Sequence, residues 1–342
     1  MMLPDPVSHA SAPQATTAHT VARSAGVSQS TVSLVLSGKW QGRVAPGTAE
    51  RVLQVAAQLH YHPNVSGRRL RTGRSELIGL AVPDGAHPFF GELFVAADQA
   101  ARLAGYTLML LDTVTDPRWA GRVADLLRSN QLAGCIVYSG DAAAHTTLGG
   151  EQSRLILIEP NTAQGGHFTF DFAYAMDRVV AHLTELGHRR VGYFAADYAS
   201  VTFQQRYEAF QAAARRHRLV VPDSARGRST FEVESATQAA LQLLRSSDIT
   251  ALVCDDDLLA AAVIRACRQL GRRVPQDLSV IGFGDLAVAR YVEPELTTVR
   301  LPAAAMGRAA VETLLHQLER GGAAAQRLFS LEVVVRASTG VV

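Results

Sequence analysis

The regular hydrophobic pattern nearest the amino terminus is that of two short helices joined by a turn. Gly26 supplies a conformation that favours the turn, and Ser28 has a side chain that can cap a second helix. The apolar positions that share one face of the first helix are Val21, Ala22 and Ala25. Those of the second helix are Val32, Val35 and Leu36. This spacing predicts a helix-turn-helix.

A third helix follows at a short distance. Pro46 is typical of a helix start, and a residue that precedes a proline is disfavoured in a helix, so the helix should end before His62-Pro63. Its apolar positions are Val52, Val55, Ala56 and Leu59. Three short helices predict a compact head domain.

The polar side chains on the outside of the second helix are short or carry an amide: Gln29, Ser30, Ser33 and Ser37. Such side chains can hydrogen-bond to base edges and phosphates in a major groove. A small helical hairpin inside an ordinary domain would show the same hydrophobic pattern, so this segment alone leaves that alternative open.

From Ile78 onward, short β-branched strand patterns alternate with helical patterns, which indicates parallel sheets covered by helices. The predicted strands are 78–82, 107–111, 135–138, 155–158, 190–194, 251–254 and 279–283. The predicted helices are 90–104, 119–128, 175–186, 204–217, 233–244 and 258–270. The pattern comes in two similar halves, so we expect a small all-α head followed by an α/β module of two parallel-sheet subdomains.

The segment after the head, Tyr61–Arg74, reads YHPNVSGRRLRTGR and leads into the strand Ile78–Val82. At these residues the chain resembles the lactose/galactose repressor (LacI/GalR) family of bacterial transcription regulators. Five further motifs of that family recur in the same order: Pro88-Phe89-Phe90, Gly187-His188-Arg189-Arg190, Val274–Phe283, Leu296–Val299 and Arg336–Thr339. The resemblance extends from Thr17 to Thr339 and implies a periplasmic-binding-protein-like module whose two subdomains are joined by crossing strands.

The resemblance also implies that a short hinge helix follows the head and wedges a leucine into the minor groove. Leu70 matches that leucine, and an apolar wedge beside arginines is how proteins unstack and bend a duplex. Asn64, Arg68 and Arg69 match the flanking polar positions. The residues from which we expect DNA contacts are Thr17, Ser28, Gln29, Ser30, Thr31, Ser33, Ser37, Asn64, Arg68, Arg69 and Leu70.

A small-molecule effector is implied for the cleft between the two subdomains, because open parallel sheets bind ligands at the carboxyl ends of their strands. The residues that match or adjoin the family's cleft positions are Phe89, Phe90, Asp171, Arg206, Phe231, Asp256, Asp257 and Asp285. Aromatic rings, carboxylates and an arginine suit a polyhydroxylated ligand, since rings stack on C–H faces and charged groups pair with hydroxyls. We expect Arg206 to project into the cleft beside Asp171 and Asp256.

Simpler roles are open for single members of this set. Phe89 and Phe231 could belong to the hydrophobic core, and Asp171 and Asp257 could be helix N-caps. Arg206 is the member for which the cleft assignment is clearest.

Four positions depart from the family pattern. Leu34 stands where many members have an arginine at the end of the recognition helix, so one phosphate or base contact is missing. Gly67 replaces the usual hinge alanine, which costs a helix about 1 kcal/mol. In the cleft, Gly284 stands where members often present an aspartate, and Phe172 replaces a common asparagine. These cleft changes bear on which effector is bound.

Charge separates the head from the rest of the chain. Residues 17–75 hold eight Arg or Lys and one acid, Glu50, a net charge of +7, whereas the whole chain of 342 residues carries +2. A strongly basic head on a nearly neutral chain favours a polyanionic partner over a merely solvated charged face. With 48% hydrophobic residues, the chain can bury the cores of two or three domains.

The first sixteen residues are rich in proline and small polar residues, without Lys, Arg or an apolar run long enough for export, so we expect a disordered tail. No apolar stretch reaches about 18 residues, and we expect a cytoplasmic, nucleoid-associated protein without a membrane partner. Cys135, Cys254 and Cys267 are widely spaced and odd in number, which favours buried free thiols over disulfides or a metal site.

Two other classes of protein fit parts of the sequence. Gly282–Ala287 fits a loose dinucleotide fingerprint, but it lies near the carboxyl end instead of opening a first βα unit. Asp255–Asp257 suggests a cation, but adjacent strand residues point to opposite faces. The carboxyl module alone would also fit a solute-binding protein of a transporter. The basic head and the missing export signal do not fit that class of protein. We expect no enzyme, no cofactor and no metal.

The sequence therefore predicts a tail over 1–16, a helix-turn-helix domain over 17–63, a hinge helix and linker over 64–75, and an effector-binding and dimerisation domain over 76–342. The predicted function is that of a homodimeric transcription regulator, most simply a repressor, on a pseudo-palindromic operator. A small molecule, a sugar or related metabolite, would control its operator affinity from the cleft.

Overall fold

The computed structural model describes residues 16–61, 75–138, 141–160, 167–322 and 326–342. By its contacts the chain divides into two compact units, Met1–Arg74 and Ser75–Val342. Ser75, which the sequence assigned to the linker, belongs to the second unit, because its hydroxyl donates to the Gln131 carbonyl and accepts from the Leu77 amide. The predicted tail up to residue 15 lies outside the described residues. So do the predicted hinge residues Asn64, Arg68, Arg69 and Leu70.

The head contains the three predicted helices, α1 (Ala18–Ala25), α2 (Gln29–Leu36) and α3 (Pro46–Gln58). Gly26 ends α1 in the left-handed conformation, with a φ of 67°, which confirms its role in the turn. The buried apolar residues that hold the three helices together are Val21, Ala22, Ala25, Val32, Val35, Ala49, Val52 and Ala56. The amphipathic pattern of the sequence therefore describes the head core correctly.

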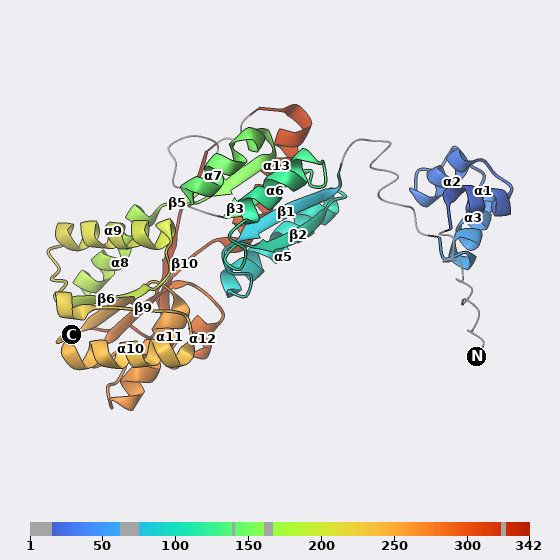
Figure 1. Cartoon of the computed structure of the whole chain (residues 1–342). Helices are drawn as coiled ribbons and strands as arrows, with labels where there is room; N and C mark the ends of the chain where they lie inside the picture. Colours follow the sequence, from blue (N-terminus) through green and yellow to red (C-terminus); the bar gives the residue numbers. More distant parts are fainter. Residues whose placement is uncertain (1–15, 62–74, 139–140, 161–166, 323–325) are drawn as a thin grey trace, which may run out of the picture. The chain divides into compact units, whose positions relative to one another are not determined.

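The second unit has two lobes, each built on a six-stranded sheet (Figure 1). The sheet of the first lobe is parallel throughout, in the order β11-β5-β4-β3-β1-β2. Its strands are β1 (Leu77–Val82), β2 (Thr107–Asp112), β3 (Gly134–Tyr138), β4 (Leu155–Ile158), β5 (His167–Phe170) and β11 (Arg327–Phe329). Its helices are α5 (Pro88–Leu103), α6 (Trp119–Arg128), α7 (Ala142–Leu148) and α13 (Ala303–Arg320), with a 3₁₀ turn at Gly149–Arg154.

The sheet of the second lobe has the order β12-β10-β9-β8-β6-β7, and only β12, beside β10, runs antiparallel to its neighbour among the described strands. Its strands are β6 (Val191–Ala196), β7 (Arg226–Ser229), β8 (Ala251–Cys254), β9 (Ser279–Gly284), β10 (Thr297–Arg300) and β12 (Glu332–Val334). Its helices are α8 (Phe172–Glu185), α9 (Val201–Arg216), α10 (Val233–Ser246), α11 (Asp257–Gln269) and α12 (Val288–Tyr291), with a 3₁₀ turn at Asp223–Ala225.

The chain crosses between the lobes three times, so the lobes are interleaved. It leaves the first lobe after β5, returns to it for α13 and β11, and ends in the second lobe with β12 (Figure 1). Gly307 allows α13 to pack closely on α5, because a Cβ at this position would lie 2.3 Å from the Leu93 carbonyl oxygen. The prediction of two parallel-sheet subdomains joined by crossing strands is confirmed.

The three cysteines are free and buried, as the sequence suggested. None of the helices in the described ranges combines the length and apolar character that a bilayer crossing requires.

Candidate DNA-binding and effector sites

Ser28 begins α2 as predicted. Its side-chain oxygen accepts a hydrogen bond of 3.1 Å from the Thr31 amide, which satisfies one of the exposed N–H groups of the first turn. Thr17 caps α1 in the same way, by accepting a bond of 3.3 Å from the Thr20 amide. Both hydroxyls therefore fix the helices of the head, whatever they contact on DNA.

The outer face of α2 is polar. Gln29, Ser30 and Ser37 are exposed, and Thr31 and Ser33 are half-buried. Val32 and Val35, on the opposite face, are buried in the head core. The structure thus presents the predicted DNA-contacting side chains of α2 together on one surface.

The surface of the head also carries basic side chains. The described basic residues of the head are Arg23, Lys39, Arg43 and Arg51, and all four are exposed. The described part of the head contains one acid, Glu50, which is also exposed. The described part of the head is therefore basic at its surface, which suits a phosphate backbone.

The second candidate site lies where strand ends of the two lobes meet. In the first lobe, Tyr138 ends β3 and Glu159 follows β4. Burial raises the pKa of Tyr138, and Arg206 and Thr202, both on α9 of the second lobe, oppose this rise. These effects require the two lobes to be in close contact at Tyr138.

Phe89 and Phe90 lie in the first turn of α5 and are 5% and 8% exposed. Their rings pack edge-to-face on Tyr138, with centroid distances of 5.8 and 5.0 Å. Both belong to a large hydrophobic core cluster, which was the simpler of the two roles open for Phe89. They also form an aromatic wall beside the strand ends, and their contact with an effector stays a prediction.

Arg206 is 3% exposed. One guanidinium nitrogen donates to the Asp255 carbonyl, and the Asp255 carboxylate lies 3.9 Å away. The guanidinium carbon lies 3.7 Å from the centroid of the Phe283 ring, within the range of a cation–π contact. The expectation that Arg206 lies beside Asp171 and Asp256 needs correction, because the described acid within ion-pair distance of its guanidinium is Asp255.

The three consecutive aspartates have three different environments. Asp255 accepts hydrogen bonds from the Tyr193 hydroxyl and the Ala196 amide, and burial raises its pKa. Asp256 caps α11 by accepting from the Leu258 amide at 2.8 Å. The chain direction at the end of β8 therefore turns the side chains of this run apart.

Asp257 is fully buried. Its carboxylate accepts from the Thr298 hydroxyl at 2.6 Å and from the Leu286 amide at 2.7 Å. Burial, and then the charge of Asp256, raises the pKa of Asp257 to about 7. Asp257 therefore holds three segments of the second lobe together, and its oxygens are occupied there.

Two other predicted effector residues have partners of their own. Asp171 caps α8 by accepting from the Tyr174 amide at 2.9 Å, which was the simpler role open for it. Asp285 pairs with Arg336 and, at 2.7 Å, with Arg300, and these arginines lower its pKa against the effect of burial.

Phe231 reaches the first lobe. Its ring lies 5.1 Å from the His87 ring and 4.8 Å from the Tyr198 ring. The structure thus gathers Phe231 and Asp256 around His87, and gathers Arg206 with Asp255 beside Tyr138 and Glu159. Sequence reasoning missed His87, Tyr138, Glu159 and Asp255. Three of the four, all except His87, end or follow a parallel strand, so the rule that ligands bind at carboxyl strand ends could have found them.

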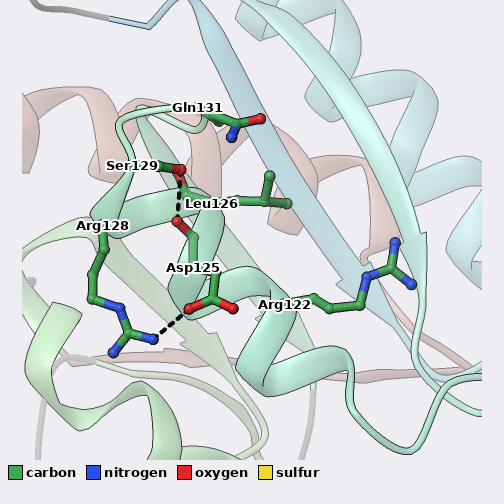
Figure 2. Close-up of a pocket in the computed structure, with 6 residues that line it drawn as sticks. All are labelled: Arg122, Asp125, Leu126, Arg128, Ser129 and Gln131. Carbon is green, nitrogen blue, oxygen red and sulfur yellow. Dashed lines mark hydrogen bonds and ion pairs between the residues drawn. The ribbon is translucent and has the colours of Figure 1, made fainter.

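A separate depression on the first lobe lies along α6 and the loop after it (Figure 2). Its lining residues are Arg122, Asp125, Leu126, Arg128, Ser129 and Gln131. Arg128 pairs with Asp125 at 2.6 Å, and the Ser129 hydroxyl donates to the Asp125 carbonyl at 2.7 Å. Polar groups that pair within one helix end are ordinary surface structure, so we do not treat the depression as a site. The described residues contain no group of three or more His, Cys, Asp or Glu that could hold a metal ion.

Comparison with known proteins identifies both units. Residues 17–64 match the family described as bacterial regulatory proteins, lacI family, and residues 180–339 match the periplasmic binding protein-like domain. The HTH-type transcriptional regulator reg1 of Streptomyces lividans is 36% identical over 340 residues, which cover 93% of this chain and 95% of that protein.

Two solved structures share the fold. The Lac repressor dimer bound to operator and the anti-inducer ONPF has a TM-score of 0.85 at 24% identity, covering 96% of this chain and 100% of that chain. A LacI family transcriptional regulator from an Arthrobacter strain, in complex with lactose, has a TM-score of 0.67 at 27% identity, covering 78% of this chain and 99% of that chain.

A helix-turn-helix head and a two-lobed ligand-binding module define a transcription regulator whose DNA binding is controlled by an effector. The chain belongs to the lacI family of bacterial regulatory proteins. The resemblance stated from the sequence is confirmed.

Proposed function

We propose that the protein is a homodimeric repressor that binds a pseudo-palindromic operator through α2 and changes its operator affinity when a carbohydrate binds between the lobes. The observation that carries the proposal is the polar row on α2. It stands on a basic head, is capped by Ser28 and is backed by the buried Val32 and Val35. Two copies would place their α2 helices in successive major grooves, about 34 Å apart.

A second copy has a suitable surface on the first lobe. β2 is an edge strand, and apolar side chains on β2, just after it and on α5 are exposed: Val95, Leu103, Leu110 and Val114. An exposed apolar edge is a feature that monomeric proteins avoid. Leu103→Lys should therefore shift the sedimentation coefficient toward the monomer. Tyr291→Lys, at an equally exposed apolar residue of the second lobe, should leave it unchanged.

The carbohydrate assignment rests on the chemistry at the lobe junction. Arg206, acidic groups and the aromatic wall of Phe89 and Phe90 offer hydrogen-bonding groups beside apolar rings, which is what sugars require. The lactose complex of the Arthrobacter regulator supports this class of ligand. An effector that favours one arrangement of the lobes should change operator affinity by about 5–150-fold, or about 1–3 kcal/mol. Since its partner is DNA, we place the protein in the cytoplasm, at the nucleoid.

The DNA-binding part of the proposal can be tested by selecting binding sites for the full chain from random DNA duplexes. Affinity for the selected site should fall linearly with salt on a logarithmic scale, because phosphate contacts release counterions. Gln29 can pair with adenine through both amide atoms, so Gln29→Ala should lose about 1–3 kcal/mol and relax the preference at one base pair. Gln54→Ala, on the exposed side of α3, is the matched control. An unchanged preference in the Gln29 variant would contradict the placement of α2.

The effector-binding part of the proposal can be tested with operator titrations in the presence of lactose and other neutral sugars. Arg206→Ala should remove the change in operator affinity that the sugar causes. Arg215→Ala, at an exposed position of the same helix, should retain it. A sugar response that survives in the Arg206 variant would move the effector site away from the lobe junction.

A further inference from the structure

Lysine is rare in this chain. Of its 33 Lys and Arg residues, one is a lysine, Lys39, and the rest are arginines. An arginine guanidinium stays protonated in proteins and is a poor nucleophile, whereas a lysine amine can lose a proton and attack a carbonyl carbon. Lys39 is therefore the one side chain of the sequence with a primary amine that an acyl donor can convert to an amide.

The backbone of Lys39 is fixed at the end of α2. Gly38 has a φ of 73°, and its amide donates to the Val35 carbonyl at 3.0 Å. The Lys39 amide donates to the Leu34 carbonyl at 3.1 Å. These two bonds form the Schellman motif, which closes many helices. They hold Lys39 two residues beyond Ser37, the last residue of the polar row on α2.

The side chain of Lys39 is exposed, and its amine has neither a hydrogen bond nor an ion pair within the described part of the chain. It is one of the four basic residues that the described head sets against a single acid, Glu50. A free amine beside the polar row can contact a DNA phosphate, and it is open to a small reagent when DNA is absent. Acetylation removes the positive charge. It should therefore weaken binding to every duplex and make it less dependent on salt.

The charge of the head also favours one class of acyl donor. An acyl phosphate is an anion, so a basic surface attracts it and raises its local concentration. In the reaction, the unprotonated Nζ of Lys39 attacks the carbonyl carbon of acetyl phosphate. The bond between this carbon and the phosphate oxygen breaks, and inorganic phosphate leaves. The nitrogen releases one proton as the amide forms, and the balance requires no other reactant.

We propose that Lys39 is a modification site, that acyl phosphates acetylate it, and that the acetylated protein binds its operator more weakly. Operator affinity is then under a second control, which acts on the head instead of the lobes. The inference rests on the proposed function, because it requires α2 to lie on DNA.

The test uses the full chain, acetyl phosphate and a selected operator. Mass spectrometry should find an acetyl group on Lys39, and operator affinity at about 0.1 M salt should fall about tenfold or more. The slope of log affinity against log salt should become shallower by about 1 for each Lys39 on the duplex, hence by about 2 for a homodimer. Lys39→Gln removes the charge without a reagent and should reproduce both changes. Lys39→Arg keeps the charge, so it should bind as the native protein does and should not respond to acetyl phosphate.

A variant in which the lysine is moved is the matched control. Lys39→Arg combined with Arg245→Lys transfers the amine to an exposed position of α10 in the second lobe. Acetylation of this variant should leave its operator affinity unchanged. Operator present during the reaction should slow acetylation of Lys39 in the native protein severalfold, and it should leave the rate at position 245 of the variant unchanged.

The proposal is overturned if Lys39 stays unmodified, if the acetylated protein binds operator as tightly as the untreated protein, or if operator leaves the acetylation rate of Lys39 unchanged. Operator titrations of the untreated protein separate this result from the proposed function. Absence of sequence-specific binding there would contradict the proposed function. Specific binding that acetylation leaves unchanged would contradict only the role of Lys39.

Discussion

Nε2 of His87 lies 3.2 Å from Oδ2 of Asp256, and this contact joins the two lobes. Nδ1 of the same ring accepts from the Phe89 amide at 3.3 Å, so the proton of the neutral ring is on Nε2, facing the carboxylate. The contact is within ion-pair distance but does not have hydrogen-bond geometry. Each partner also caps a helix, His87 at α5 and Asp256 at α11, so the link is anchored to rigid elements on both sides.

A double-mutant cycle can measure this link. Asparagine caps helices well, so His87→Asn and Asp256→Asn should keep both caps while removing the contact between the lobes. In urea unfolding, the two changes together should destabilise the protein by about 1 kcal/mol less than the sum of the single changes. As a control, His316→Asn changes an exposed histidine of α13, and its effect on the free energy of unfolding should add to that of Asp256→Asn. Additivity of the first pair as well would show that the contact contributes nothing to lobe closure.

Gly282 tests the packing beneath the second lobe's strand ends. A Cβ at this position in β9 would lie 2.1 Å from Oδ1 of Asp257 and 2.6 Å from Leu296. Gly282→Ala should therefore lower the free energy of unfolding by about 1–3 kcal/mol, because buried groups must shift. Gly121→Ala is the matched control in α6, where a Cβ meets nothing within 4 Å. There the added methyl should raise stability by about 0.5–1 kcal/mol. Equal denaturation midpoints for the two variants would contradict the close approach.

The head could be predicted from the sequence because its signals are local. Apolar spacing defined three helices, and Ser28 and Gly26 marked the turn between the first two. The central strands were found for a similar reason, since a buried parallel strand is a continuous apolar run. The strands β5, β7, β10, β11 and β12 were missed, because each is three or four residues long at or near a sheet edge and is defined by remote partners.

The site was harder to predict than the fold. Asp171 and Asp256 are helix caps, and a sequence cannot show whether a capping carboxylate also meets a ligand. The sequence predicted Asp256 as a neighbour of Arg206, but the structure has Asp255, one residue earlier. The geometry at the end of β8 decides which aspartate faces α9, and the sequence does not show it. Glu159 was missed because the groups that act on it, Thr202 and Arg206, come from the other lobe.

Stability should depend on pH through Asp257. Its pKa is about 7 in the folded protein, whereas an ordinary aspartate, as in the unfolded chain, has a pKa of 3.8. Between pH 3.8 and about 7, the folded protein therefore keeps a proton that the unfolded chain has lost. Unfolding then releases a proton, and the free energy of unfolding should fall as the pH rises from about 4 to about 7, by up to about 4 kcal/mol. Above pH 7 this contribution should be constant.

Asp257→Asn cannot titrate, so its unfolding free energy should vary less with pH in that window. Asp248→Asn is the control, because the exposed Asp248 pairs with Arg190, which lowers its pKa and moves its titration below the window. Urea unfolding at half-unit steps from pH 4.5 to 7.5 gives the two slopes. If the unfolding free energy of the Asp257 variant varies with pH as steeply as that of the native protein, the pH dependence comes from other groups.

The cap of the recognition helix can be examined without DNA. Ser28→Ala removes the acceptor of the Thr31 amide, and loss of such a cap costs about 1 kcal/mol, which should speed amide exchange over Gln29–Leu36 about fivefold. Ser30→Ala, an exposed serine in the same turn, should leave exchange within the scatter of the native protein. Both variants can then be compared on a selected operator. Ser28→Ala should lose affinity because α2 is less ordered, whereas Ser30→Ala should lose only the affinity that its own contact with DNA supplies. Identical exchange in the two variants would mean that the hydroxyl of Ser28 is free to act on DNA alone.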